Sequence, residues 1–136
     1  MKQRKAADRR VRGTIRARVN FGRIIKSNPQ SGYVCYYHAY LGLAYAGLGR
    51  REEAIREGKE AVRMMPISKD AVMGPELVSY LADIYMRCGE HEAAIDQLET
   101  LLSLPGYYMT ANILRIDPLW DPIRSNPRFK RLVEGS

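Results

Sequence analysis

The 136-residue sequence has few of the residues on which metal and redox chemistry depend. It holds two cysteines, Cys35 and Cys88, and two histidines, His38 and His91. The cysteines lie too far apart in the sequence to form the close pairs of zinc or redox motifs. His91 is followed by Glu92, but no second histidine follows at metalloprotease spacing. These shortages predict no metal site, and two free thiols in a reducing compartment.

Long apolar runs are also missing. The longest weakly polar stretch, residues 40–49, covers about ten residues, whereas a membrane-spanning helix needs roughly 20. The basic N-terminus is followed by no apolar segment of the kind found in secretory signal peptides. The sequence also lacks a glycine-rich phosphate loop and a serine elbow. We therefore expect a cytoplasmic protein without membrane contact that has no cofactor and no catalytic residue, and so is not an enzyme.

Helix-forming residues, by contrast, are abundant. Leu, Ala, Arg and Glu are plentiful, and alternating runs of β-branched residues are absent. Apolar residues make up 46% of the chain, which is enough for one hydrophobic core at this length. The composition predicts an all-α protein.

Two stretches of the chain repeat one another forty residues apart, with the same inner spacings of four, four and five residues. Self-similarity at such a period is typical of stacked helical hairpins, which commonly bind other proteins. The first stretch contains Leu41, Tyr45, Gly49 and Ala54, and the second contains Leu81, Tyr85, Gly89 and Ala94.

Apolar residues that recur every three or four positions predict two helices in each copy. Gly49 and Gly89 stand where a helix commonly ends in a left-handed glycine. The connections are so short that the paired helices must be antiparallel. Gly42 and Ala54 supply small side chains where two helix axes cross. The predicted helices cover residues 33–49, 51–65, 75–87 and about 90–105.

The two copies share small and apolar residues at matching positions, which are Leu41, Gly42, Tyr45, Ala54, Ala61 and Pro66 in the first and Leu81, Ala82, Tyr85, Ala94 and Leu98 in the second. This pattern resembles the tetratricopeptide repeat (TPR) family. The resemblance covers residues 35–66 and 75–105, and implies a right-handed superhelix of antiparallel helical hairpins. The chain departs from the family at His38 and Val78, which replace its tryptophan, and in a repeat of forty rather than thirty-four residues.

A third, partial copy lies upstream. Its residues follow the spacing of the second helix of the first copy and are Ala17, Phe21, Ile24 and Pro29. We interpret residues 13–29 as a half repeat, with a helix from Thr14 to Ser27, at the start of a single domain over residues 13–136. Residues 1–12 are nearly all charged and have no core face. We expect them to form a basic, poorly defined segment or a frayed, solvated helix.

Residues 107–134 are predicted to form a C-terminal cap of short helices. An Asp or Asn stands directly before a Pro at residues 117–118, 121–122 and 126–127. Such a residue can cap a helix whose first residue is the Pro. We expect helices at 107–115, 118–124 and 127–133, which would cover the open end of the second hairpin.

Residues 114–129 also resemble the end of repeat regions appended to bacterial serine/threonine kinases, adenylate cyclases and related signalling regulators. No kinase or cyclase motif occurs in the chain. The resemblance therefore implies only the accessory region, without the effector domain.

Residues that differ between the copies predict a binding groove for a peptide. Tyr33, Tyr36 and Tyr40 fall on the stripe of the first helix that faces the concave groove in TPR proteins. Aromatic rings on rigid helices anchor a peptide at little entropic cost, although such rings also serve as plain packing between helices. The predicted groove residues are Tyr33, Tyr36, Tyr40, Leu43 and Gly47 from the first copy, and Glu76, Ser79, Asp83, Met86 and Arg87 from the second.

Positive charge is concentrated at the N-terminus. Residues 1–28 hold ten basic side chains and Asp8, giving 10 − 1 = +9, so the remainder sums to 7 − 9 = −2. We predict a non-catalytic scaffold or regulatory module that binds a protein or peptide in the groove. The basic segment itself is interpreted as a solvated or disordered helix, or as a contact for an acidic partner or an acidic neighbouring domain. The alternative function is a nucleic-acid-binding protein acting through residues 2–26, in which only Phe21 could stack on a base. If the half repeat lacks its partner helix, its exposed face would pair with a second copy, giving a homodimer.

Overall fold

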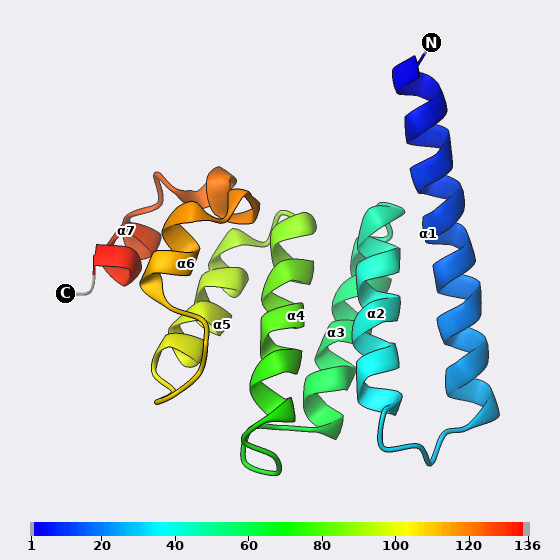
Figure 1. Cartoon of the computed structure of the whole chain (residues 1–136), viewed down its shortest axis with the longest axis horizontal. Coiled ribbons are helices and arrows are strands. Elements are labelled where there is room, and N and C mark those ends of the chain that lie inside the picture. The colour runs from blue at the N-terminus through cyan, green and yellow to red at the C-terminus, as the bar shows by residue number, and fades with distance from the viewer. Residues whose placement is uncertain (1, 135–136) are drawn as a thin grey trace.

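The computed structural model describes residues 2–134, and these residues form an all-helical chain in which neighbouring helices pack side by side (Figure 1). No helix within this part of the chain combines the length and apolarity needed to cross a membrane. The helices are α1 (Lys2–Ser27), α2 (Val34–Gly47), α3 (Arg51–Met64), α4 (Met73–Arg87), α5 (His91–Leu102), α6 (Ala111–Ile116), the 3-10 helix η1 (Pro118–Ile123) and α7 (Pro127–Glu134).

The forty-residue repeat in the sequence is also a repeat in the backbone. Helices α2 and α3 form one antiparallel hairpin and α4 and α5 form another (Figure 1). Gly49 and Gly89 turn the chain with φ of 75° and 77°, the left-handed region that favours glycine. The next N–H in each copy, that of Arg50 or Glu90, donates to the carbonyl oxygen five residues earlier at 2.9 Å. The predicted hairpins and their glycine turns are confirmed.

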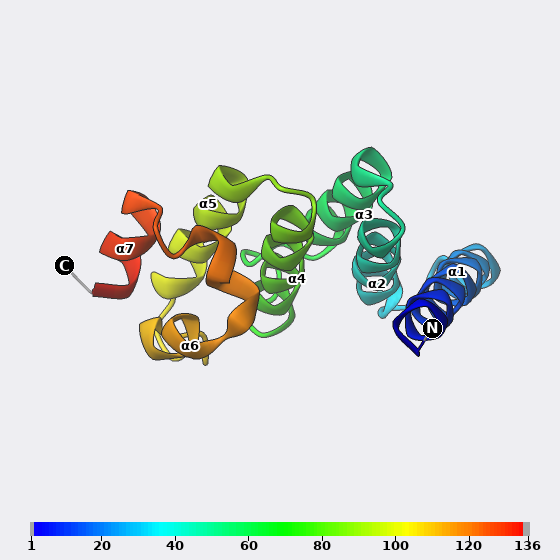
Figure 2. The same ribbon diagram turned by 90° about the horizontal axis from the view of Figure 1, so that it is seen from above.

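Figure 2 shows two sides to the molecule. Helices α3 and α5 lie on one side, and α1, α2, α4 and α6 lie on the other. The second helix of each hairpin is thus on the α3–α5 side. Helix α1 lies on the α2–α4 side, and its Phe21 packs against Tyr37 and Tyr40 of α2.

Helix α1 begins at Lys2 rather than near Thr14, so residues 2–12 form the solvated helix that was one of the two forms expected for them. Lys, Arg, Gln and Ala all favour helices, and no proline interrupts them, so the segment forms a helix without needing a buried face. Twenty-six residues span about 39 Å, whereas the fourteen residues of α2 span about 21 Å. The first part of α1 therefore extends beyond α2 (Figure 1). Its described side chains up to Gly13 are exposed.

The C-terminal helices cover the end of the second hairpin, as predicted. Their buried apolar residues join one core with residues of α4 and α5 such as Leu98 and Leu101, both fully buried. Asp117 and Asn126 cap their helices by accepting backbone N–H bonds at 3.0 and 2.9 Å. The buried residues that the cap contributes are Met109, Leu114, Trp120, Ile123 and Phe129.

Two features of the cap were not predicted. Helix α6 begins at Ala111 rather than Tyr107, because the Thr110 hydroxyl accepts the N–H of Ile113 at 3.3 Å and sets the start of the helix. Arg128 of α7 forms ion pairs at 2.7 to 3.0 Å with three carboxylates of α5, those of Glu92, Asp96 and Glu99.

Two glycines allow the hairpins to pack closely. A Cβ on Gly42 of α2 would lie 2.7 Å from Cδ1 of Ile84 and 3.0 Å from the carbonyl oxygen of Ala54. A Cβ on Gly58 of α3 would lie 2.8 Å from the same Cδ1 atom. The fully buried Ile84 of α4 therefore fills a notch that exists only because both positions lack a side chain.

We predict that Gly42→Ala destabilises the fold. The added methyl group overpacks the notch, which costs about 1–3 kcal/mol and outweighs the gain of up to about 1 kcal/mol in helix propensity. Urea unfolding followed by circular dichroism measures the change. Gly22→Ala in α1 is the matched control, because its Cβ would meet nothing within 4 Å and stability should hold or rise. A Gly42→Ala protein as stable as the wild type would contradict the prediction.

Candidate peptide-binding groove

Helices α2 and α4 present matching faces, in which each position of α2 has a counterpart forty residues later in α4. The contacts in the structure follow the same offset, since Tyr36 contacts Glu76 and Tyr40 contacts Tyr80. We call this surface the groove face. Its residues are Tyr36, Tyr40, Leu43 and Gly47 from α2, and Glu76, Tyr80, Asp83 and Arg87 from α4.

A hydrogen bond joins the two hairpins across the groove face. The hydroxyl of Tyr36 donates to Oε2 of Glu76 at 2.7 Å. Burial, together with the neighbouring Glu76 carboxylate that accepts this bond, raises the pKa of Tyr36 well above its usual value. The Tyr36 ring is therefore held in place at both ends, by the helix backbone and by its hydroxyl.

Aromatic rings continue across three helices. The ring of Tyr40 lies 5.4 Å from Phe21 of α1, 6.2 Å from Tyr36 and 5.6 Å from Tyr80, measured between centroids. These separations are those of favourable aromatic pairs, and the Tyr40–Tyr80 pair is edge to face. Because Phe21 is engaged by Tyr37 and Tyr40, its ring is not free to stack on a nucleic-acid base.

The groove face has a hollow at each end. One, of about 610 Å³, lies between α1 and α2 and is lined by Phe21, Tyr40, Leu43 and Arg87 among others. The second, of about 410 Å³, lies between the start of α4 and residues 104–108. Both hollows open beside partly exposed aromatic side chains.

Close contacts shape the two hollows. A Cβ on Gly47 would lie 3.2 Å from Cγ2 of Thr14, so the glycine lets α1 approach α2. The hydroxyl of Tyr107 donates to the carbonyl oxygen of Pro75 at 3.3 Å, which holds the loop before α6 against α4.

The structure brings most of the predicted groove residues together, but not Tyr33 or Met86. Tyr33 precedes α2 and is 65% exposed, outside both hollows. Met86 is only 6% exposed and belongs to the core, so its side chain does not line the groove. Asp83 and Arg87 do lie on this face, where they form an ion pair at 2.5 Å. Ser79 is half-buried on α4.

Tyr80, Tyr107 and Phe21 were missed as groove residues. The forty-residue offset alone would have identified Tyr80, because it is the counterpart of Tyr40. The same offset pairs Met86 with Ala46, which is not a groove position. Nothing in the sequence indicated Tyr107 or Phe21, since both reach the groove through contacts between separate elements.

The groove face offers binding chemistry, namely aromatic rings, hydroxyls and two carboxylates. Among the side chains that the structure describes, no group of three or more His, Cys, Asp and Glu could hold a metal ion. Cys35 and Cys88 are free thiols. His38 does contact a carboxylate, with Nδ1 at 2.5 Å from Oε2 of Glu57, but this pair lines a different hollow beside α1 and α3.

We predict that Tyr80 makes stability fall at alkaline pH. Burial and then the hydrogen bond with Tyr40 raise the pKa of Tyr80 to about 12 from its ordinary value of about 10. A raised folded-state pKa gives stability that is fully present below about pH 10 and is lost as the pH rises towards about 12. Urea unfolding at a series of pH values should show this loss, and Tyr80→Phe should reduce it. An equal loss in both proteins would show that Tyr80 is not the cause.

Comparison with known proteins identifies no family for this chain. A scan against protein-family models finds no match, and neither does a search of curated proteins or of solved structures.

Proposed function

We propose that this chain is a TPR-like right-handed superhelix that acts as a non-catalytic scaffold or regulatory module. Its role is to hold a peptide segment of a partner protein on the groove face. Support comes from the two hairpins with the same glycine turns, and from contacts between α2 and α4 that follow the forty-residue offset. The resemblance of residues 114–129 supports a place in bacterial signalling, in the cytoplasm.

One observation carries the proposal. The rings of Tyr36, Tyr40 and Tyr80 are only partly buried, yet each is fixed by a neighbour on another turn or another helix. Rings that are already ordered lose little side-chain entropy when a ligand covers them. Tyrosine is also enriched among the residues that dominate binding energy in protein interfaces.

The chemistry of the groove face indicates the kind of peptide. Aromatic rings favour an apolar or aromatic anchor residue. Glu76 keeps a second carboxylate oxygen beyond the one bonded to Tyr36, and it lines the hollow near residues 104–108. The charge of Asp83 is offset by Arg87. We therefore infer a peptide with an apolar anchor and a neutral or basic flank.

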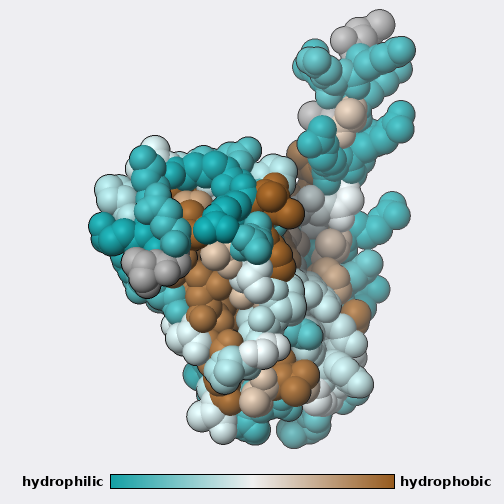
Figure 3. All heavy atoms as spheres, turned by 60° about the vertical axis from the view of Figure 1, so that its left-hand side comes forward, coloured by the Kyte–Doolittle hydropathy of each residue, from teal (hydrophilic) through white to brown (hydrophobic). Residues whose placement is uncertain are grey.

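Helix α1 supports a second candidate, electrostatic binding of nucleic acid. Its ten basic residues lie along one continuous helix, and those in the part that rises above the body give it a hydrophilic surface (Figure 3). Phosphate contacts of this kind carry no sequence information. With Phe21 packed in the groove wall, this candidate is limited to binding without sequence preference.

We predict that peptides selected against the full chain depend on Tyr40. The probe is a labelled peptide enriched by panning a random phage-displayed library on the immobilised protein, with affinity measured by fluorescence anisotropy. Tyr40→Ala should weaken binding by roughly 30-fold, the loss typical of an interface hot spot. Tyr36→Phe should also weaken binding. It removes a single hydroxyl from the same face and so disturbs folding less.

Tyr45→Ala is the matched control for this experiment, because a peptide that loses affinity for Tyr45→Ala but not for Tyr40→Ala would be bound in the hollow beside α3 and not on the groove face. It removes the same side chain from the same helix, but Tyr45 lines the hollow beside α3 and packs under Arg50. Circular dichroism verifies that each variant is folded. Selected peptides that bind Tyr40→Ala, Tyr36→Phe and the wild type equally would eliminate the groove face as the binding site.

The nucleic-acid candidate makes a separate prediction. A labelled random DNA duplex should bind the full chain with an affinity that falls steeply as salt is added. The double variant Arg4→Gln/Arg9→Gln removes two exposed charges from α1 and should weaken this binding, whereas Arg56→Gln/Lys59→Gln on α3 should not. Binding that ignores salt, or no binding at low salt, would eliminate this candidate.

A further inference from the structure

Helix α1 carries a row of exposed apolar side chains, which we call the α1 stripe. It consists of Val11, Ile15 and Val19, which are 47%, 43% and 42% exposed. Residues spaced by four lie on one face of a helix, so the three form a continuous strip. Of the three, Val11 also borders the groove-face hollow between α1 and α2. A contiguous row of exposed apolar residues is a candidate interaction surface.

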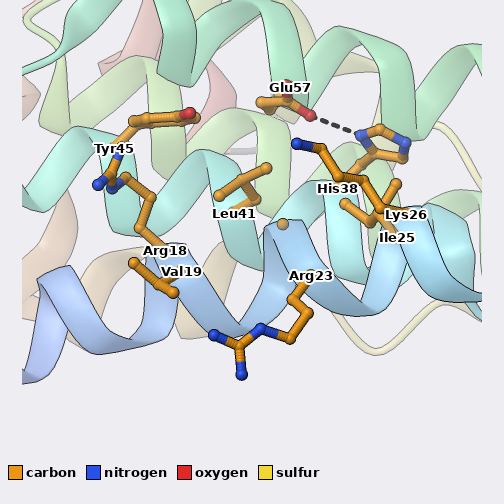
Figure 4. Close-up of a pocket in the computed structure, with 10 residues that line it drawn as sticks. Arg18, Val19, Arg23, Ile25, Lys26, His38, Leu41, Tyr45 and Glu57 are labelled. Atoms are coloured by element: carbon orange, nitrogen blue, oxygen red, sulfur yellow. Dashed lines mark hydrogen bonds and ion pairs between the residues drawn. The ribbon is translucent and has the colours of Figure 1, made fainter.

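The α1 stripe leads into a hollow of about 600 Å³ on the α3 side of α2 (Figure 4). Val19 and Gly22 of α1 form one wall, and Leu41 and Tyr45 of α2 lie in the hollow opposite them. Glu57 of α3 closes the far side. This hollow shares no lining residue with either hollow of the groove face.

The charges around this hollow are mostly positive. Arg18, Arg23 and Lys26 line it against a single carboxylate, Glu57, which is already bonded to His38. In Figure 4 Arg18 points towards Tyr45 and Lys26 reaches towards the Glu57–His38 pair, while Arg23 points away. The Nε atom of Arg18 is shielded from solvent and has no hydrogen-bond partner among the described residues.

We propose that the α1 stripe and this hollow form a second docking site, which binds an acidic amphipathic helix of a partner protein. The apolar face of such a helix would cover the α1 stripe and reach Leu41. Its flanking carboxylates would pair with Arg18 and Lys26. The hollow lies on the other side of α2 from the groove face, and its occupant is distinct from the peptide proposed there.

Charge argues for an acidic partner rather than a second copy of the chain. Residues 1–28 of each copy carry +9 and the whole chain carries +7, so two α1 helices placed side by side would repel one another. An acidic helix gains from the same charges, both in affinity and in the rate of encounter.

The probe for this site is a fluorescein-labelled synthetic helical peptide with leucines along one face and glutamates beside them. A second peptide with lysines in place of the glutamates is the matched probe. The full chain should bind the acidic peptide saturably, more weakly as salt rises, and should not bind the lysine peptide. Val19→Ser should weaken binding by about tenfold, because it removes an apolar contact from the centre of the site.

Ile24→Ser is the control variant. Ile24 is also exposed, at 37%, but lies five residues after Val19 and so about 140° around the helix. It should leave the affinity within about threefold. Tyr36→Phe should also leave it unchanged, which separates this site from the groove face.

Four results would overturn the proposal. The first is equal binding of the acidic and lysine peptides, and the second is no saturable binding of the acidic peptide. The third is loss of acidic-peptide binding in Tyr36→Phe while Val19→Ser binds the peptide like the wild type. The fourth is a different occupant of the α1 stripe, shown either by a dimer in sedimentation that Val19→Ser dissociates or by Val19-dependent binding to phosphatidylserine vesicles without binding of the peptide.

Discussion

The notch that Gly42 and Gly58 leave for Ile84 determines how the two hairpins meet. One methyl group of Ile84 lies where a Cβ on either glycine would have to be, so α2, α3 and α4 approach more closely than residues with side chains would permit. Protein interiors are packed tightly enough that such a contact fixes the relative position of whole helices. The register of α2 against α4 depends on it.

The groove face depends on that register. Tyr36 reaches Glu76 and Tyr40 reaches Tyr80 only when each residue of α2 lies beside its counterpart in α4. Core packing thus orders the rings before any ligand arrives. Helix α1 then adds a wall on one side through Phe21 and, on the other side of α2, borders the positively charged hollow with its exposed stripe. The same helix therefore borders both candidate sites.

The sequence predicted the hairpins well because their signals are local. Apolar spacing indicated the helices of both hairpins, and Gly49 and Gly89 marked turns whose φ angles proved to be left-handed. It failed where contacts between distant elements decide the outcome. Helix α1 contacts α2 through Phe21, which meets Tyr37 and Tyr40, and α7 contacts α5 through Arg128, which reaches three carboxylates.

Two other regions were less well defined by the sequence. For residues 2–12 a poorly defined segment and a solvated helix were both left open because the segment has no buried face, and its helix-favouring residues form the helix. Met86 was predicted to line the groove. Comparison with the first copy puts it beside Ala46, off the groove face, and the structure buries it in the core.

A double-mutant cycle on Gly42→Ala and Ile84→Val tests the central contact most directly. Valine lacks the Cδ1 atom that the new methyl group would meet, so the second change makes room for the first. Unfolding free energies should show that Gly42→Ala costs less in the Ile84→Val background than in the wild type, by an interaction energy of about 0.5–3 kcal/mol. Costs that add to within about 0.3–0.5 kcal/mol would contradict the account, because the notch would then not be what sets the hairpin packing.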